Sequence, residues 1–148
     1  MKNYLDAIED TRKEVERSRA NETQHWHYLT TPLTSTSWDG DAYSSAAKTL
    51  INLNTVFGVP AGVKAIYARV LARDSASATS STVEFSLSNY SGAGFAQVSV
   101  KPGGLPNDYW ADHTIICSCN ADGNIYYAVT ASGAGTMDIH LIIFGWMY

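Results

Sequence analysis

Hydrophobic and polar residues alternate in short runs along the chain after residue 48, and Gly, Pro, Asn, Asp or Ser bound each run. In TVEFSLSN, Val83, Phe85 and Leu87 alternate with polar residues, as expected of a strand with one buried face. Runs of this kind predict strands at residues 49–54, 63–74, 82–89, 94–101, 113–120, 124–131 and 137–148. Short strands separated by turn residues favour a mainly β fold, an antiparallel β-sandwich of the jelly-roll-like type.

Asp122 and Gly123 stand between the strands predicted at 113–120 and 124–131. Gly readily adopts the positive φ that a type I′ turn requires, and Asp-Gly is typical of two-residue hairpins. We therefore expect these two strands to form a tight hairpin.

The last predicted strand, MDIHLIIFGWMY, has apolar residues on both faces. A two-layer sandwich of this size cannot bury both faces of its sheets. We therefore expect the strand to lie in the middle of a sheet, with Ile139, Leu141 and Ile143 in the core. The alternate positions should lie near a subunit contact in a homotrimer, and the predicted interface residues are Ile142, Phe144, Trp146 and Tyr148.

Residues 1–22 have a different composition, with 11 of the 24 charged residues and neither Gly nor Pro. Acidic residues come early and basic residues late, as the helix dipole favours, so the segment is predicted to be helical. Its apolar stripe is too thin to hold a helix on a globular core. We expect residues 1–24 to be an anchor or oligomerisation segment, although a solvated helix without a partner is the alternative. The candidate anchor residues are Tyr4, Leu5, Ile8 and Val15.

Residues 25–48 contain Pro32 and clusters of Ser, Thr, Asp and Gly, which predict an irregular connector before a β-sandwich domain at residues 49–148. Aromatic residues recur in this connector, including Trp26, Tyr28 and Trp38. We expect them to cover one end of the sandwich rather than to bind a ligand.

Composition excludes several classes of function. Charged residues make up 16% of the chain and the net charge is -4, which argues against nucleic acid, because phosphate binding depends on clustered Lys and Arg. The longest apolar run is much shorter than the ~20 residues of a membrane-spanning helix. The N-terminus is charged where a signal peptide would be apolar, so synthesis in the cytoplasm is expected.

The sequence is poor in groups that could carry catalysis. It has no Gly-x-Ser-x-Gly motif and no set of His and Cys with convincing metal-ligand spacing. Cys117 and Cys119 are interpreted as small buried residues, since an i,i+2 disulfide within a strand would be strained. We therefore expect no enzymatic activity, no cofactor and no metal.

Tyr and Trp in loops between strands are the remaining candidates for binding. Exposed aromatic rings on β loops can stack on sugar rings, and the residues in such positions are Tyr90, Tyr109 and Trp110. The alternative is that Tyr109 and Trp110 begin a strand and cover the end of the sandwich.

The layout of the chain resembles small virion proteins of tailed bacteriophages, of the head-decoration or short-fibre type. The similarity rests on LINLNTVFGVPAGVKAIYARVLARDS and on the ending HLIIFGWMY, within residues 49–148. It implies a structural, non-enzymatic protein on the virion whose β-sandwich trimerises while the N-terminal segment attaches to capsid or tail proteins. A carbohydrate- or receptor-binding module at a tail-fibre tip, with a host surface glycan as partner, is the alternative. The N-terminal helix is not matched by the resemblance.

Overall fold

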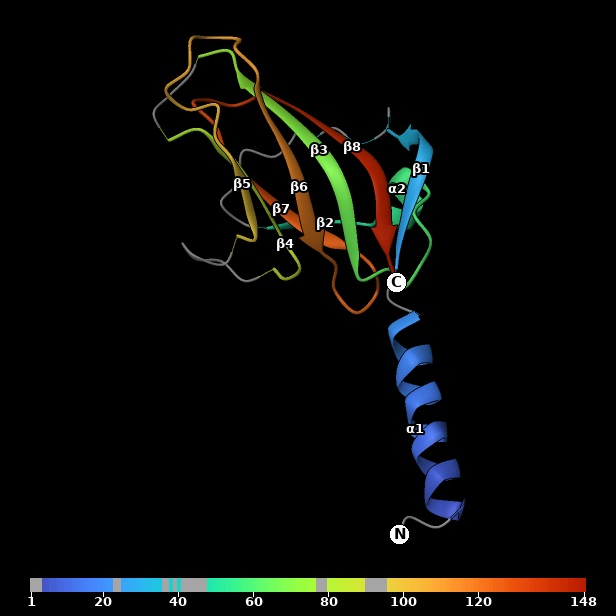
Figure 1. Cartoon of the computed structure of the whole chain (residues 1–148). Coiled ribbons are helices and arrows are strands. Elements are labelled where there is room, and N and C mark those ends of the chain that lie inside the picture. Colours follow the sequence, from blue (N-terminus) through green and yellow to red (C-terminus); the bar gives the residue numbers. More distant parts are fainter. Residues whose placement is uncertain are drawn as a thin grey trace.

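The computed structural model describes residues 4–22, 25–35, 38, 40, 48–76, 80–89 and 96–148, and the side chains of helix α1 from residue 8 to residue 17. Helix α1 (Tyr4–Glu22) comes first and extends away from the rest of the molecule (Figure 1). This confirms the predicted N-terminal helix. Among the described residues, no helix has both the length and the apolar character needed to span a lipid bilayer.

The rest of the described chain is a β-sandwich of two antiparallel four-stranded sheets. Sheet A has the order β1-β8-β3-β6 and sheet B the order β2-β7-β4-β5. The strands are β1 (Trp26–Leu33), β2 (Thr49–Ile51), β3 (Ala65–Asp74), β4 (Thr82–Ser86), β5 (Val98–Val100), β6 (Ala111–Ser118), β7 (Ile125–Thr130) and β8 (Met137–Met147).

The pairing of the strands is nested along the chain. The first strand pairs with the last, β2 with β7, β3 with β6 and β4 with β5. Contacts of β8 with β3 and of β7 with β4 complete the two sheets. Nested antiparallel pairs folded into two sheets are the topology of a jelly roll, so the predicted fold class is confirmed.

The core lies between the two sheets and follows from the alternation of each strand. In β3, Ile66, Ala68 and Val70 are fully buried, while the residues between them face outwards. Phe85 and Tyr127 are the largest fully buried side chains of sheet B, and Trp38 packs edge-on against Tyr127. Trp38 therefore packs against the core as predicted, but the same prediction is wrong for Tyr28, which is 66% exposed.

The connector prediction for residues 25–48 is wrong in its first part, because β1 pairs with β8 and belongs to sheet A. The β1–β8 register shifts between Tyr28 and Leu33, and Pro32 lies within this irregularity. Proline removes a backbone donor but is tolerated at the edge of a sheet or in a bulge. The sandwich therefore begins at Trp26, before the predicted boundary.

The strand predicted at residues 49–54 ends at Ile51, and the short helix α2 (Leu53–Phe57) follows it. Asn52 caps this helix, because its side-chain Oδ1 accepts a hydrogen bond of 2.9 Å from the Thr55 backbone N–H. Gly58 ends it in the left-handed conformation, with φ of 77°. Leu53 and Phe57 point into the core in place of strand residues.

The predicted Asp122-Gly123 hairpin is also wrong. A turn is present, with Gly123 at φ of 78°, but it connects β6 of sheet A to β7 of sheet B, and these two strands do not pair. Asn120 holds the turn by accepting hydrogen bonds from the backbone N–H groups of Asp122 and Asn124. Leu87, predicted to face the core with Phe85, lies beyond β4 and is exposed.

Strand β8 lies between β1 and β3, and Ile139, Leu141 and Ile143 are buried in the core. Both predictions for this strand are therefore confirmed. Tyr67 of β3 is opposite Gly145 and Ala68 is opposite Ile143, so Phe144 is an extra residue that forms a bulge.

The bulge reverses the alternation, and Trp146 turns into the core with 7% of its surface exposed. The reason for placing Trp146 at a subunit contact therefore does not hold, since its own chain buries it.

Candidate functional site

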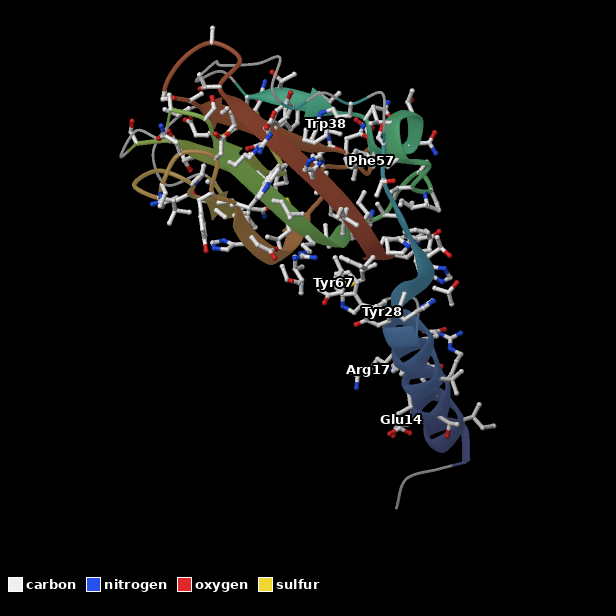
Figure 2. All side chains as sticks on the ribbon, turned by 90° about the horizontal axis from the view of Figure 1, so that it is seen from above. Glu14, Arg17, Tyr28, Trp38, Phe57 and Tyr67 are labelled. Carbon is white, nitrogen blue, oxygen red and sulfur yellow. The ribbon has the colours of Figure 1, made fainter. Side chains whose placement is uncertain are left out.

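The outer face of sheet A carries several aromatic and charged side chains that could bind a partner. In β3, Tyr67, Arg69, Leu71 and Arg73 point to this face, because the residues that alternate with them are buried. Their neighbours across the sheet come from β8 and β6 and follow from the pairing register. We call this surface the sheet A face. Figure 2 shows Tyr67 and Tyr28 on one side of the sheet, and Trp38 and Phe57 on the core side.

One end of the sheet A face is aromatic and apolar. The rings of Tyr67 and Phe144 lie 5.9 Å apart, and Tyr28 packs edge-on against Tyr67 at 6.1 Å. Ile116 is opposite Tyr67 on β6 and is 60% exposed. Ala68 is opposite Ile143, so Phe144 is the next residue along β8 and lies beside Tyr67, while the bulge places Gly145 opposite Tyr67 as well.

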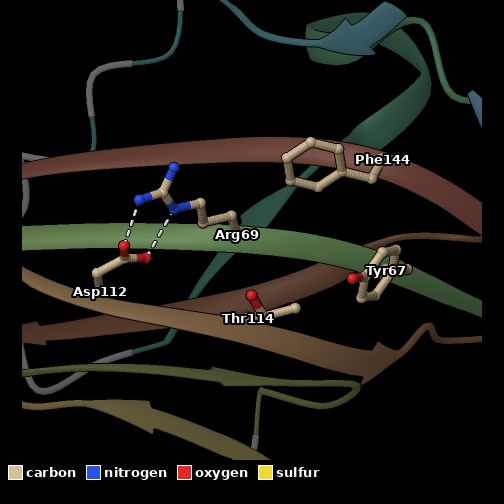
Figure 3. A pocket seen from close by; sticks show the side chains of 5 residues that line it. All are labelled: Tyr67, Arg69, Asp112, Thr114 and Phe144. Atoms are coloured by element: carbon tan, nitrogen blue, oxygen red, sulfur yellow. Dashed lines mark hydrogen bonds and ion pairs between the residues drawn. The ribbon is translucent and has the colours of Figure 1, made fainter. Parts of the chain in front are cut away.

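Next to these rings, Arg69 and Asp112 form a two-pronged ion pair (Figure 3). Arg69 Nε donates a hydrogen bond of 2.8 Å to Asp112 Oδ1, and Nη2 donates to Oδ2. The bond with Arg69 lowers the pKa of the Asp112 carboxyl, and Asp112 in turn raises the pKa of Arg69. Both groups therefore stay charged at neutral pH, although each side chain is about two-fifths exposed.

The other end of the sheet A face has a second charged group. Arg73 is paired with Asp138 of β8, and its guanidinium lies 4.8 Å from the centre of the Trp110 ring. The ring of His140 also packs against the Trp110 ring, with 5.2 Å between the two centroids. A cation over an indole face is attracted by the ring quadrupole, so Trp110 is fixed on the sheet A face.

A shallow depression lies between the aromatic end and the first ion pair. Its volume is about 460 Å³, and it is lined by the side chains of Tyr67, Arg69, Asp112, Thr114 and Phe144. The strand register explains why this depression exists. Thr114 is directly opposite Arg69, but the Arg69 side chain extends diagonally to Asp112, which is opposite Leu71. The small side chain of Thr114 is left at the floor between larger ones.

The structure separates the predicted ligand residues. Trp110 lies on the sheet A face, whereas Tyr109 is 62% exposed and is not among the residues that line the depression. Tyr90 lies outside the described residues. The prediction for Tyr90 is therefore not tested, and of the two described residues Trp110 contacts Arg73 and His140 on the sheet A face.

The predicted interface residues are also divided. Ile142 is opposite Arg69 on the sheet A face, and Phe144 lines the depression. Tyr148 is 40% exposed, while Trp146 faces the core. In helix α1, Ile8 and Val15 are exposed. The side chains of the other two predicted anchor residues, Tyr4 and Leu5, lie outside the described set.

Sequence reasoning missed Tyr67, Arg69, Asp112 and Thr114 as candidate site residues. A signal existed, because Tyr67 and Arg69 alternate with buried residues in one strand and Asp112 and Thr114 occupy alternate positions in another. What was missing was the pairing of β3 with β6, which places the two sets side by side. Pairing between distant strands is not encoded in local periodicity.

The two cysteines contribute no reactive group. Burial raises the pKa of Cys117 to about 12, with a smaller contribution from Cys119, and burial alone raises the pKa of Cys119 to about 12. Both thiols therefore stay protonated at neutral pH, which makes them poor nucleophiles and poor metal ligands. Within the described residues, no group of three or more His, Cys, Asp or Glu side chains is arranged to hold a metal ion.

No protein-family model matches this chain, and no curated protein shows significant similarity to it.

Proposed function

We propose that this chain is a structural protein on the surface of a tailed-bacteriophage virion, attached through helix α1 and displaying the jelly roll as a homotrimer. The observation that carries the proposal is the contrast between a well-packed jelly roll and a projecting helix (Figure 1). Apart from partly buried Glu9, the described side chains of α1 are exposed, and Ile8 and Val15 form a thin stripe along it. A helix of this kind gains stability by docking on a partner.

Attachment is tested on particles of the phage that encodes the chain. Full-length protein added to particles that lack it should bind, and a chain of residues 25–148 should not. The variant Ile8→Ser with Val15→Ser should bind at least tenfold more weakly. The matched control is Glu14→Ser with Arg17→Ser, which also leaves the net charge unchanged. With about 3.6 residues per helical turn, these two positions lie on other sides of the helix from Ile8 and Val15.

Three results would overturn the proposed attachment: particles that never contain the chain, equal binding by residues 25–148, or equal loss of binding in both double variants. The first would remove the virion assignment, and the other two would remove the role of the stripe.

A trimer requires an apolar contact between subunits. The outer faces of sheet A and sheet B each have apolar residues that could form one. On sheet B, Leu50 is 45% exposed and is opposite Tyr126. On sheet A, a contact through Ile142 and Phe144 would also remove water from the Arg69 ion pair, which costs free energy. We place the contact at Leu50 and Tyr126 because that arrangement leaves the sheet A face hydrated.

Light scattering distinguishes these arrangements. The purified chain should be a trimer at micromolar concentration, and Leu50→Ser should shift it towards monomer while Ile142→Ser should not. A trimer that is dissociated by Ile142→Ser would instead place the contact where the sequence predicts it. A monomeric wild-type chain would contradict the trimer altogether.

A second candidate function is a carbohydrate- or receptor-binding module at a tail-fibre tip. It is favoured by one observation, the depression on the sheet A face with aromatic rings beside a fixed ion pair. The two functions are compatible, since a virion surface protein can also bind a host surface.

A further inference from the structure

The depression on the sheet A face has apolar and polar surface side by side, as a sugar ring does. A pyranose has apolar C–H faces and a rim of hydroxyl groups. Tyr67 and Phe144 supply apolar ring surface, with their centroids 5.9 Å apart and their planes tilted by 47°. The Arg69–Asp112 pair and Thr114 supply polar groups beside these rings. In small-molecule sites a few fixed polar groups orient the ligand.

The ion pair keeps hydrogen-bonding capacity that its own contacts do not use. A guanidinium has five N–H donors, of which two are directed at Asp112, and each Asp112 oxygen accepts one of these bonds. Donors on Arg69 and lone pairs on Asp112 thus remain beside each other. Two adjacent hydroxyl groups of a sugar match this arrangement, because one can accept from the guanidinium while the other donates to the carboxylate.

The pair is also held in place before any ligand arrives. A two-pronged contact fixes both side chains in one geometry, and Tyr28 packs against the edge of Tyr67 and restrains its ring. Because these groups are ordered in the free protein, binding loses less side-chain entropy than it would with mobile groups. The volume of about 460 Å³ is within the range of small-molecule sites.

Charge favours a neutral ligand over an anionic one. The positive charge of Arg69 is balanced by Asp112, and that of Arg73 by Asp138. An acidic sugar would find no cation in the depression that is not already paired with a carboxylate.

We propose that the depression lined by Tyr67, Arg69, Asp112, Thr114 and Phe144 binds a neutral pyranose unit of a surface polysaccharide, with the ring stacked on the aromatic side chains and two adjacent hydroxyl groups bonded to the Arg69–Asp112 pair. This inference deepens the second candidate function and rests on it, but it does not depend on where the chain is attached.

The test measures binding of the purified full chain to immobilised neutral glycans that end in glucose, galactose, mannose or N-acetylglucosamine, with sialylated glycans for comparison. At least one neutral glycan should bind, and Tyr67→Ala and Asp112→Asn should each weaken that binding at least tenfold. The matched controls are Tyr109→Ala, at an exposed tyrosine that does not line the depression, and Glu84→Gln, at an outward position on sheet B. The controls should bind like the wild-type chain.

The proposal is overturned if no neutral glycan binds at millimolar concentration, if sialylated glycans bind more tightly than neutral ones, or if the sheet A variants bind as well as the controls. It is also overturned if Tyr67→Ala changes the oligomeric state measured by light scattering and glycan binding is not detected, because the sheet A face is then a contact between copies. Virion attachment is not measured in this assay, so its failure and that of the structural role are separate results.

Discussion

Helix α1 and the jelly roll are stabilised by different kinds of interaction. The ion pairs of α1 among the described side chains join residues three or four apart, such as Arg12 with Glu9 and with Glu16. The jelly roll depends on contacts between distant parts of the chain, such as the pairing of Ala72 with Ile139. Exposed ion pairs in helices contribute only about 0.3–0.5 kcal/mol each.

The two regions therefore differ in the interactions that determine their stability, and they also lie apart in space. A change in α1 should stay local, whereas a change in the jelly roll should lower the stability of the whole sandwich, because small domains unfold cooperatively. Variants in the two regions should therefore differ in how much they lower the unfolding midpoint.

The largest effect should follow from removing Gly145–Tyr148. The deletion takes away buried Trp146 and the pairing of this segment with both β1 and β3. Loss of a buried Trp side chain alone costs about 3–5 kcal/mol, a large part of the roughly 5–15 kcal/mol that stabilises a domain. A chain ending at Phe144 should therefore be insoluble or unfolded at 25 °C.

The measurement is thermal unfolding followed by tryptophan fluorescence, beside the full chain. Removal of Tyr148 alone is the control and should shift the midpoint by only a few degrees, because that side chain is 40% exposed. An unchanged midpoint for the longer deletion would contradict the central position of β8.

Asp74 should give the next largest effect. It lies at the end of β3, is 1% exposed, and accepts hydrogen bonds from Ser81 Oγ, Ser132 Oγ and the backbone N–H groups of Ser132 and Ala76. These bonds tie β3 to two loops. Asp74→Ala leaves their donors unsatisfied and should lower the free energy of unfolding by about 3 kcal/mol, as measured by urea denaturation.

The same carboxylate should make stability depend on pH. Burial acts to raise the pKa of Asp74, but the hydrogen bonds from Ser132, Ser81 and the backbone outweigh it and hold the pKa well below its usual value. A carboxyl whose pKa is lower in the folded state stabilises the protein above its unfolded pKa, about 3.9, and this contribution is lost as the pH falls towards the folded pKa. The difference in unfolding free energy between wild type and Asp74→Asn should thus be constant from pH 7 to 5 and shrink below about pH 4. If the difference in unfolding free energy stayed constant down to pH 2.5, the lowered pKa of Asp74 would be contradicted.

A smaller effect, about 1 kcal/mol, is expected from Asn52→Ala. This change removes the side-chain cap of α2, and loss of such a cap typically costs about that much. Asn52→Ser, which can still accept the hydrogen bond from Thr55 N–H, should retain most of the stability. Equal loss in both variants, measured by urea denaturation, would show that the cap is not the cause.

Local patterns were enough to predict most of the strands and the N-terminal helix, because alternation and helix-forming composition are properties of neighbouring residues. The central position of β8 was also predictable, since apolar residues on both sides of MDIHLIIFGWMY require cover on both faces. The errors occurred where one local signal has two solutions. Asp122-Gly123 makes a turn in either case, and only the sheet membership of β6 and β7 decides that it is not a hairpin.

The candidate site was less predictable than the fold. Asp112 and Arg69 are far apart in the chain and meet only because β3 and β6 pair in a particular register. The inward turn of Trp146 depends on a single-residue bulge at Phe144. The bulge accompanies Gly145, where a Cβ atom would lie 2.4 Å from the His27 carbonyl oxygen, so close contact with β1 requires glycine there. Neither feature has a periodic signature.

The smallest effect should come from Glu14→Gly in α1, and it tests the separation of the two regions directly. Glycine in an exposed helix costs roughly 0.5–1 kcal/mol of helix stability relative to Ala, so the variant should lose helical signal in far-ultraviolet circular dichroism. The unfolding midpoint of the jelly roll, followed by tryptophan fluorescence, should nevertheless stay within one or two degrees of wild type, roughly the shift that a few tenths of a kcal/mol would cause. Ala68→Gly is the matched control, because Ala68 is fully buried in β3 and the introduction of glycine there should lower the midpoint by several degrees. If Glu14→Gly lowered the midpoint as much as Ala68→Gly, the helix would have to pack on the sandwich, and the view of α1 as a separate attachment segment would be wrong.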